Sequence, residues 1–200
     1  MCSSDLPPVR ELLIDWRTAL FLARIGGRLI SDNRLLEAIV REIESRGFTV
    51  IGPADVEPTL LARVGPYGRI APTEAERHAI ASGLRAARNL GRRDVGQAVV
   101  MLGDAILDTE GADGTDAMIA RCAGKHKDGA GPILVKARKP QQQMRADPPV
   151  VGMVTLQTAT ASGFRGVAVE SGGVLLLNGP ALARAADAAG IFLAGVDEKP

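Results

Sequence analysis

The segment from Glu57 to Pro72 holds the densest group of chain-breaking residues in the first half of the sequence. It contains Pro58, Gly65, Pro66, Gly68 and Pro72. Proline removes a backbone donor and glycine costs conformational entropy, so neither a regular helix nor a central strand is expected to run through this segment. We therefore predict an interdomain linker over residues 59–72, which divides the 200-residue chain into residues 1–58 and residues 73–200.

The first part of the chain has the pattern of the end of an α/β domain. Apolar residues recur at intervals of three and four from residue 9 to residue 25, which predicts an amphipathic helix. A second helix is expected from a cap at Ser31 to Arg46, followed by a short strand over residues 48–51. Because two helices and one strand supply no sheet on which to pack, we expect residues 1–58 to be the C-terminal remnant of an N-terminal α/β domain.

The second part alternates strands and helices, which predicts a complete α/β domain with a mixed sheet. Thr73 and Glu76 form a capping box that opens a helix ending near Asn89, and Gly103-Asp104 is a hairpin-type dipeptide between two strands. Strands are expected at residues 97–102, 105–109, 133–136, 151–156, 166–169, 174–177 and 191–196, and further helices at residues 116–122, 158–162 and 180–189.

Charge and aromatic content exclude several classes of protein. The 24 Lys and Arg residues against 23 Asp and Glu give a net charge of +1, which offers no electrostatic basis for binding nucleic acid. Aromatic residues make up only 3% of the chain, too few for base-stacking platforms. Two cysteines cannot form a disulfide framework, and no apolar run approaches the roughly 20 residues of a membrane span, so we expect a cytoplasmic protein.

The first polar constellation lies between a helix and a buried strand, over residues 92–97. Asp94 and Gln97 are too polar for a core element, and Gly96 would let a ligand approach the backbone closely. The alternative is an ordinary helix-to-strand turn in which Arg92 and Arg93 are solvated.

The second constellation places the carboxylates of Glu110, Asp113 and Asp116 within seven residues, at the end of a strand and the start of a helix. The N-terminus of a helix favours anions such as phosphate, and carboxylates suit a hard cation such as Mg²⁺. The alternative is that Asp113 or Asp116 only caps the helix.

The third constellation follows a strand and carries four cations and one carboxylate within twelve residues. These are Lys136, Arg138, Lys139, Arg145 and Asp147, and the segment leaves through Pro148-Pro149. The cations suit a diphosphate, and the lone carboxylate suits a metal ion or a water molecule. A solvated loop is the alternative.

These three constellations, in this order, resemble the UDP-2,3-diacylglucosamine diphosphatase family that is typical of alpha-proteobacteria. The motifs that carry the resemblance are Gly91–Gln97, Glu110 with Gly114–Met118, and Lys136–Pro140 followed by Gln142, Arg145, Asp147 and Pro149. The likeness extends from about residue 10 to Val196.

The resemblance implies an enzyme of lipid A biosynthesis. Such an enzyme hydrolyses UDP-2,3-diacylglucosamine to 2,3-diacylglucosamine 1-phosphate and UMP by attack of water on the α-phosphorus, and it requires Mg²⁺. The resemblance also implies two α/β domains, the N-terminal one Rossmann-like, with the lipid held between them, and a homodimer. Because family members begin with a Gly-rich segment and further strands, we expect this sequence to start after them. Peripheral contact with the inner membrane is left open.

Site residues are carried over from the family motifs position by position. The family's catalytic aspartate lies in an Arg-x-Asp-x-Pro motif, which here makes Asp147 the catalytic residue, with Asp116 as a second candidate. One departure is Gln143, since the family usually has an acidic residue two positions before the motif arginine. The resemblance implies substrate binding by Gln97, Thr115, Lys136, Lys139, Gln142 and Arg145, and metal binding by Asp147, Asp116 and Glu110.

Two other functions stay open on the sequence. One is a non-catalytic module that binds a nucleotide-sugar or a lipid phosphate through the same cations, and the other is an inactive fragment. No nucleophile elbow, P-loop or GxGxxG pattern supports a serine hydrolase, a P-loop NTPase or a classical dinucleotide-binding protein.

Overall fold

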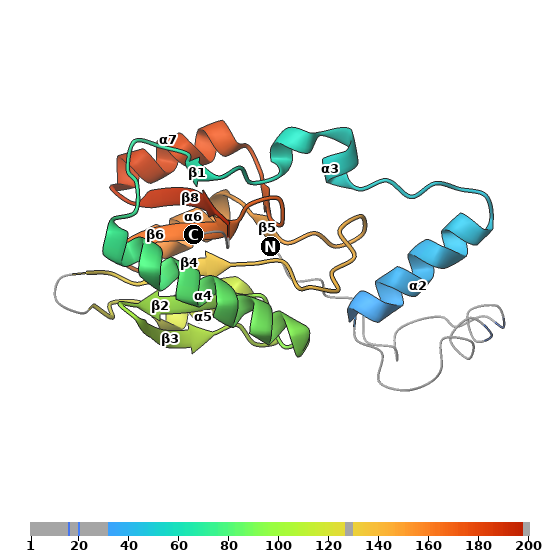
Figure 1. The fold of residues 1–200 in the computed structure, drawn as a ribbon, viewed down its shortest axis with the longest axis horizontal. Helices are drawn as coiled ribbons and strands as arrows, with labels where there is room; N and C mark the ends of the chain where they lie inside the picture. Colours follow the sequence, from blue (N-terminus) through green and yellow to red (C-terminus); the bar gives the residue numbers. More distant parts are fainter. Residues whose placement is uncertain (1–15, 17–19, 21–31, 127–129, 198–200) are drawn as a thin grey trace.

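A six-stranded mixed sheet forms the centre of the protein (Figure 1). The computed structural model describes residues 16, 20, 32–126 and 130–197. The helices are α2 (Asp32–Ser45), α3 (Pro53–Val56), α4 (Glu74–Arg92), α5 (Gly114–Arg121), α6 (Met153–Ala161) and α7 (Gly179–Ala189), with a 3₁₀ turn at Pro58–Leu60. The strands are β1 (Gly65–Pro66), β2 (Ala98–Leu102), β3 (Ala105–Thr109), β4 (Ile133–Lys136), β5 (Val150–Val151), β6 (Gly166–Glu170), β7 (Leu175–Leu176) and β8 (Phe192–Val196).

The order of strands in the main sheet is β1-β8-β6-β4-β2-β3. Strands β4, β6 and β8 are parallel, whereas β2, β3 and β1 each run antiparallel to the neighbour through which they join the sheet. The short strands β5 and β7 pair with each other in a separate two-stranded sheet. The carboxyl ends of β4, β6 and β8 therefore meet at one edge of the main sheet.

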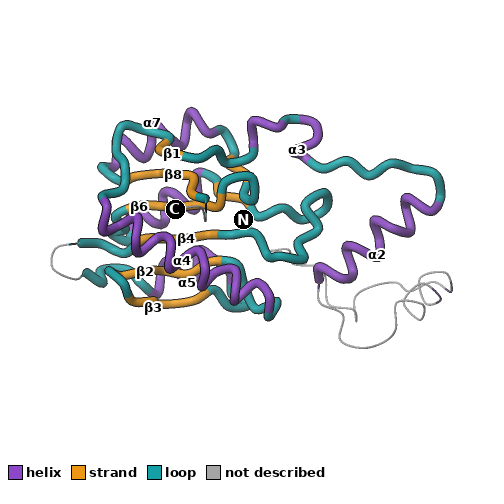
Figure 2. The backbone as a smooth tube through the Cα atoms, viewed as in Figure 1, coloured by secondary structure: helices purple, strands orange, loops and turns teal. Residues whose placement is uncertain are grey.

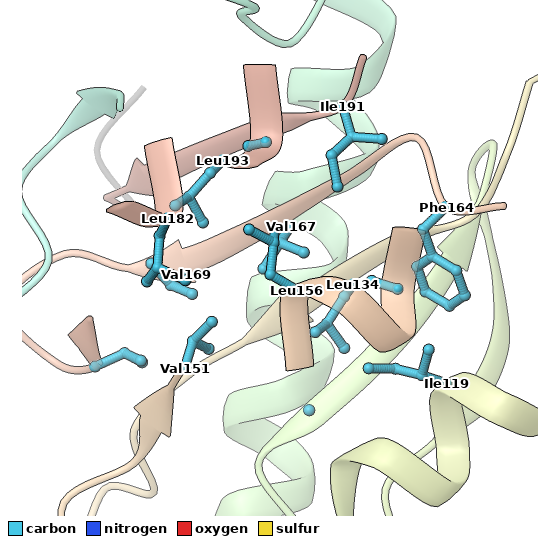
Figure 3. Close-up of a cluster of buried hydrophobic side chains, with 14 of the residues drawn as sticks. Ile119, Leu134, Val151, Leu156, Phe164, Val167, Val169, Leu182, Ile191 and Leu193 are labelled. Atoms are coloured by element: carbon cyan, nitrogen blue, oxygen red, sulfur yellow. The ribbon is translucent and has the colours of Figure 1, made fainter. Parts of the chain in front are cut away.

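Helices cover both faces of this sheet, as the tube in Figure 2 shows. Helix α4 packs on one face, where Ile80 and Leu84 contact a cluster that includes Val135 and Phe192. The other face carries α5, α6 and α7 over the larger cluster of buried aliphatic side chains drawn in Figure 3. Alternate residues of β2, β4, β6 and β8 enter the two clusters, so these strands are buried on both sides, as their continuous apolar sequences require.

Local signals in the second part of the chain are confirmed. The Thr73 hydroxyl accepts from the Glu76 amide at 3.3 Å, and the Glu76 carboxylate accepts from the Thr73 amide at 2.6 Å, so the capping box is formed. Strands β2 and β3 form the predicted hairpin, with Gly103 at a φ of 57°. Helix α7 ends at Gly190, whose φ of 72° is the left-handed conformation that glycine favours.

Three predicted strands are wrong in whole or in part. Residues 48–51 form no strand, because Phe48 and Ile51 lie on the surface and none of the strands in the described part of the chain pairs with them. Of residues 151–156, only Val151 lies in a strand, and helix α6 begins at Met153. Residues 174–177 reduce to β7, which joins β5 rather than the main sheet. The expected helix over residues 9–25 and the cap at Ser31 lie outside the described residues, apart from Trp16 and Leu20.

The segment predicted as a linker contributes to the sheet. Strand β1 pairs with β8, and the backbone of Ala62 bonds to that of Val174 and of Gly172. Part of residues 59–72 is therefore built into the domain that follows. Helix α2, by contrast, extends away from the sheet layers (Figure 1). No helix in the described part of the chain is long and apolar enough to cross a membrane.

Candidate active site

The topology brings the three polar constellations to the carboxyl edge of the parallel strands. Strand β4 ends there at Lys136, and the antiparallel strand β2 starts there, with Ala98 opposite Lys136. Strand β3 returns to the same edge, where the Glu110 amide donates to the Ala98 carbonyl at 2.9 Å. Ligands of open α/β sheets bind outside this edge, so the fold places these residues where a site is expected.

A buried network connects the second and third constellations. The Lys136 ammonium donates to the Thr115 hydroxyl at 3.0 Å and to the Val150 carbonyl at 3.2 Å. Thr115 in turn donates to one carboxylate oxygen of Glu110, and the other oxygen accepts from the Gln97 amide at 2.6 Å. Lys136 is only 2% exposed and Glu110 only 7%, so each charge depends on these bonds for its solvation. The network fixes the backbone at Val150, three residues after Asp147.

Close packing explains the glycine in the first constellation. A Cβ at Gly96 would lie 2.6 Å from the backbone oxygen of Glu110. Only glycine therefore lets the start of β2 approach the end of β3 closely enough for Glu110 to reach the Gln97 amide.

Asp147 lies in the loop that leaves β4, over residues 137–149. Its side chain is half-buried, and the side-chain amide of Gln142 donates to its backbone oxygen at 2.6 Å and to its carboxylate Oδ2 at 3.4 Å. The side-chain oxygens of Gln142 and Gln97 are buried and have no hydrogen-bond partner among the described residues. Such oxygens are positions where a donor from a ligand or water would be stabilised.

The predicted cations of this loop are engaged by carboxylates. Lys139 pairs with Asp94 at 2.7 Å, and Arg145 pairs with Glu44 of α2 at 2.5 Å. Lys139 and Arg145 are thus partly exposed, with side-chain exposures of 20% and 36%, whereas Lys136 is buried. Neither carboxylate partner could be predicted from the sequence, because Asp94 lies 45 residues from Lys139 along the chain and Glu44 lies 101 residues from Arg145.

Asp116 occupies a different position from Glu110. It lies in the first turn of α5 and accepts a hydrogen bond of 3.1 Å from the hydroxyl of Thr155 in α6. Thr155 was not predicted as a site residue, since a threonine in an apolar run carries no distinctive signal.

The connection between β3 and α5 is held by a surface group of charges. Arg121 pairs with Asp108 at 2.9 Å and also with Asp113. Burial of Asp108 opposes its ionisation, but hydrogen bonds from Arg121 and the Thr109 amide, with the charges of Arg121 and Lys125, keep the pKa of Asp108 below its ordinary value. The Asp113 side chain therefore pairs with Arg121, and it makes no capping hydrogen bond at the N-terminus of α5.

The predicted metal ligands do not form a cluster in the described part of the chain. No three His, Cys, Asp or Glu side chains among residues 32–126 and 130–197 come close enough to hold a metal ion. Both oxygens of Glu110 are bound by the protein, and Asp116 is bound by Thr155. These contacts do not fit a metal centre made from the three carboxylates alone.

The fold and site together define an α/β protein with a polar, cation-bearing site at the carboxyl edge of a mixed sheet. Residues 63–194 match the LpxI C-terminal domain and residues 5–60 match the LpxI N-terminal domain, so the chain belongs to the LpxI family. The UDP-2,3-diacylglucosamine pyrophosphatase LpxI of Caulobacter vibrioides is 34% identical over 178 residues, which cover 84% of this chain and 63% of that relative. The chain thus spans less than two thirds of the length of the curated relative that it matches.

Proposed function

We propose that the protein hydrolyses the diphosphate bond of UDP-2,3-diacylglucosamine, in lipid A biosynthesis, to 2,3-diacylglucosamine 1-phosphate and UMP. The observation that carries the proposal is the Asp147 carboxylate, held by Gln142 in a loop above the carboxyl edge of the sheet. Membership of the LpxI family and the name of the Caulobacter relative support the same reaction.

Asp147 accepts a proton from the attacking water in this proposal. The water oxygen bonds to the α-phosphorus, the bond from that phosphorus to the bridging oxygen breaks, and the sugar 1-phosphate leaves with the electron pair. A positioned carboxylate lowers the barrier by placing the water and removing its proton as the bond forms. Arg145 would bind a phosphate oxygen by exchanging its carboxylate partner Glu44 for the substrate. Lys139 would add positive charge beside the phosphates while it stays paired with Asp94.

Magnesium dependence is a separate proposal. Mg²⁺ is commonly held by one or two carboxylates together with substrate phosphates, so Asp147 and a bound diphosphate would be sufficient protein and substrate ligands. A metal bound there would neutralise charge on the phosphate oxygens. Removal of divalent cations with EDTA should abolish UMP release, and added Mg²⁺ should restore it.

An acylated substrate also needs an apolar surface. A cavity of about 390 Å³ lies where α4 meets the β1–β8 edge of the sheet, and Ile80, Leu84 and Val196 are among its mainly apolar lining residues. Apolar pockets of this size accept small ligands, which supports lipid binding by residues 73–200 together with residues 64–66 and 71–72, which also line the cavity.

The test is UMP release from UDP-2,3-diacylglucosamine, measured chromatographically on the protein at its full natural length. Asp147→Asn should lower the rate by more than about a hundredfold, because it removes the proton acceptor. The matched control is Asp104→Asn, which changes a carboxylate that is 82% exposed on the β2–β3 turn and should leave the rate unchanged. A loss of less than about tenfold for Asp147→Asn, equivalent to roughly 1.4 kcal/mol in the barrier, would show that the assigned role is wrong.

The rate of UMP release, compared with the affinity for the substrate, distinguishes an enzyme from a binding module. Tight binding of the substrate without turnover, with Mg²⁺ present, would instead support a binding module. The proposed two-domain organisation and homodimer are tested independently by limited proteolysis near residue 60 and by sedimentation equilibrium.

A further inference from the structure

A second polar cavity lies beside the loop that carries Asp147. It has a volume of about 420 Å³ and lies between the start of α2 and the end of α4. Cavities of this size are typical of small-ligand sites. Its lining residues are Asn33, Arg34 and Glu37 on α2, Arg92, Arg93 and Asp94 at the end of α4, and Gln141 on the loop.

The carboxylates that line this cavity are already neutralised. Asp94 pairs with Lys139 at 2.7 Å, and Glu37 pairs with Arg41 on the next turn of α2. Neither Lys139 nor Arg41 lines the cavity. The acidic residues therefore offset little of the positive charge inside.

The three arginines that line the cavity have no carboxylate partner among the described residues. Arg92 donates to the neutral side-chain oxygen of Asn89, and Arg34 and Arg93 are exposed. The cavity is thus lined by three arginines, one from the first turn of α2 and two from the end of α4 and its C-cap. Planar guanidinium groups bind phosphate oxygens in pairs and stay charged at any physiological pH.

Capping of α4 does not account for these arginines. The Leu90 carbonyl accepts from the backbone amides of Arg93 and Val95, and the Gly91 carbonyl accepts from the Asp94 amide and the Gln141 side chain. Backbone and glutamine donors therefore satisfy the carbonyls of Leu90 and Gly91, and the guanidinium groups are not needed for these two. The N-terminus of α2, which also faces the cavity, carries a partial positive charge that opposes the partial negative charge at the end of α4.

The two walls of the cavity are connected by Asn33. This buried side chain donates to the Gln141 carbonyl at 2.5 Å and accepts from the Gln143 amide at 2.7 Å. These bonds fix the backbone of the first turn of α2 against the loop, so the α2 wall of the cavity, which carries Arg34, is in place without a ligand. A preformed arrangement reduces the entropy lost on binding.

We infer that this cavity binds a phosphate or diphosphate group through Arg34, Arg92 and Arg93. If the proposed hydrolysis is correct, the group is the diphosphate end of the nucleotide, which the cavity holds beside the loop of Asp147. The binding part of the inference is independent of that reaction, because it depends only on the charge and shape of the cavity.

Binding is tested with pyrophosphate and with UMP as probes, by isothermal titration calorimetry on the full-length protein. Arg34→Gln with Arg93→Gln should weaken binding of pyrophosphate by about tenfold or more, since it removes two charged donor groups. Arg93→Lys keeps the charge but loses the paired geometry, so its affinity should be intermediate. The control with the same loss of charge is Arg85→Gln with Arg184→Gln, which changes exposed residues outside the cavity.

The outcomes distinguish the cavity from the proposed reaction. Equal weakening in the control pair, or unchanged pyrophosphate affinity in Arg34→Gln with Arg93→Gln, would overturn the site. The unmodified protein could bind pyrophosphate yet hydrolyse no UDP-2,3-diacylglucosamine. If the double variant then lost pyrophosphate binding, the site would be supported and only the proposed reaction would be contradicted. Weakened binding of pyrophosphate with unchanged binding of UMP would assign the cavity to the diphosphate rather than to a nucleoside monophosphate.

Discussion

The side-chain amide of Gln142 donates to both the backbone oxygen and the carboxylate of Asp147, at 2.6 Å and 3.4 Å. Gln142 is itself anchored, because its backbone amide donates to the Lys139 carbonyl at 2.9 Å. The glutamine therefore sets the orientation of the carboxylate on which the proposed chemistry depends. The substrate-binding role that the family resemblance implies for Gln142 stays a prediction, and its side-chain oxygen, which has no partner among the described residues, is the atom that would serve it.

Replacement of Gln142 by glutamate should slow the reaction and change its pH dependence. Gln142→Glu removes the donor and puts a second carboxylate beside Asp147, and like charges at this separation favour a shared proton. We expect the rate at neutral pH to fall by about tenfold or more, and the acid limb of the pH–rate profile to move to higher pH. The measurement is UMP release as a function of pH, from about pH 5 to about pH 9.

The control for this variant is Gln157→Glu, which introduces the same charge at an exposed position on α6. It should leave the pH–rate profile unchanged. An equal shift in both variants would mean that overall charge, rather than the contact with Asp147, controls the profile.

Lys136 should contribute strongly to folding stability. The Thr115 hydroxyl connects the Lys136 ammonium to the buried carboxylate of Glu110. Lys136→Met removes this cation and leaves the carboxylate uncompensated. Removing one partner of a buried ionic network costs about 3–5 kcal/mol, and we expect a loss of that size in the free energy of unfolding in urea. Lys136→Met with Glu110→Gln should recover part of the loss, because the uncompensated charge is gone.

The matched control is Lys125→Met, at an exposed lysine, which should change the free energy of unfolding by less than about 0.5 kcal/mol. A loss below about 1 kcal/mol for Lys136→Met would contradict the network, since a buried charge could then be left alone at little cost.

Cys122 should react slowly with alkylating reagents in the folded protein. Its side chain is buried, and burial followed by the charge of Asp108 raises the pKa of the thiol, so the reactive thiolate is scarce at neutral pH. Alkylation by iodoacetamide, followed by mass spectrometry of the Cys122 peptide, should be at least about a hundredfold slower in buffer than in urea. As a control, a thiol moved to the exposed neighbouring position by Cys122→Ala with Ala123→Cys should react rapidly in both conditions. Rapid alkylation of native Cys122 would contradict the packing of α5.

The parts of the fold that the sequence predicted well are those determined by neighbouring residues. The capping box of Thr73 and Glu76 and the hairpin turn at Gly103 each depend on a few consecutive residues, and both are formed. The strand expected at residues 151–156 failed for the opposite reason. Helix α6 packs against α5, α7 and β6, so it is apolar on several sides and its short sequence shows no helical period.

The candidate site was predictable in its location but not in its contacts. Charged residues after β4 and carboxylates after β3 indicated the two segments, and the topology brings both to one edge. Which side chains are buried depends on contacts between distant parts of the chain. Lys136 thus lies in the interior with Glu110, although the sequence grouped it with the cations of the loop, of which Lys139 and Arg145 are partly exposed.

Asn33 should control how firmly α2 is attached to the loop of Asp147. Asn33→Ala removes both the bond to the Gln141 carbonyl and the acceptor for the Gln143 amide. We expect the Gln143 amide to exchange with deuterium at least about tenfold faster, because each lost bond is worth about 1 kcal/mol or more. The amides of β4 and β6 should exchange at unchanged rates, since the main sheet does not depend on α2. Arg41→Ala, at an exposed position on the same helix, should leave the Gln143 amide protected. Unchanged protection in Asn33→Ala would mean that other contacts hold α2 in place, and the cavity beside Arg34 would then keep its shape without this asparagine.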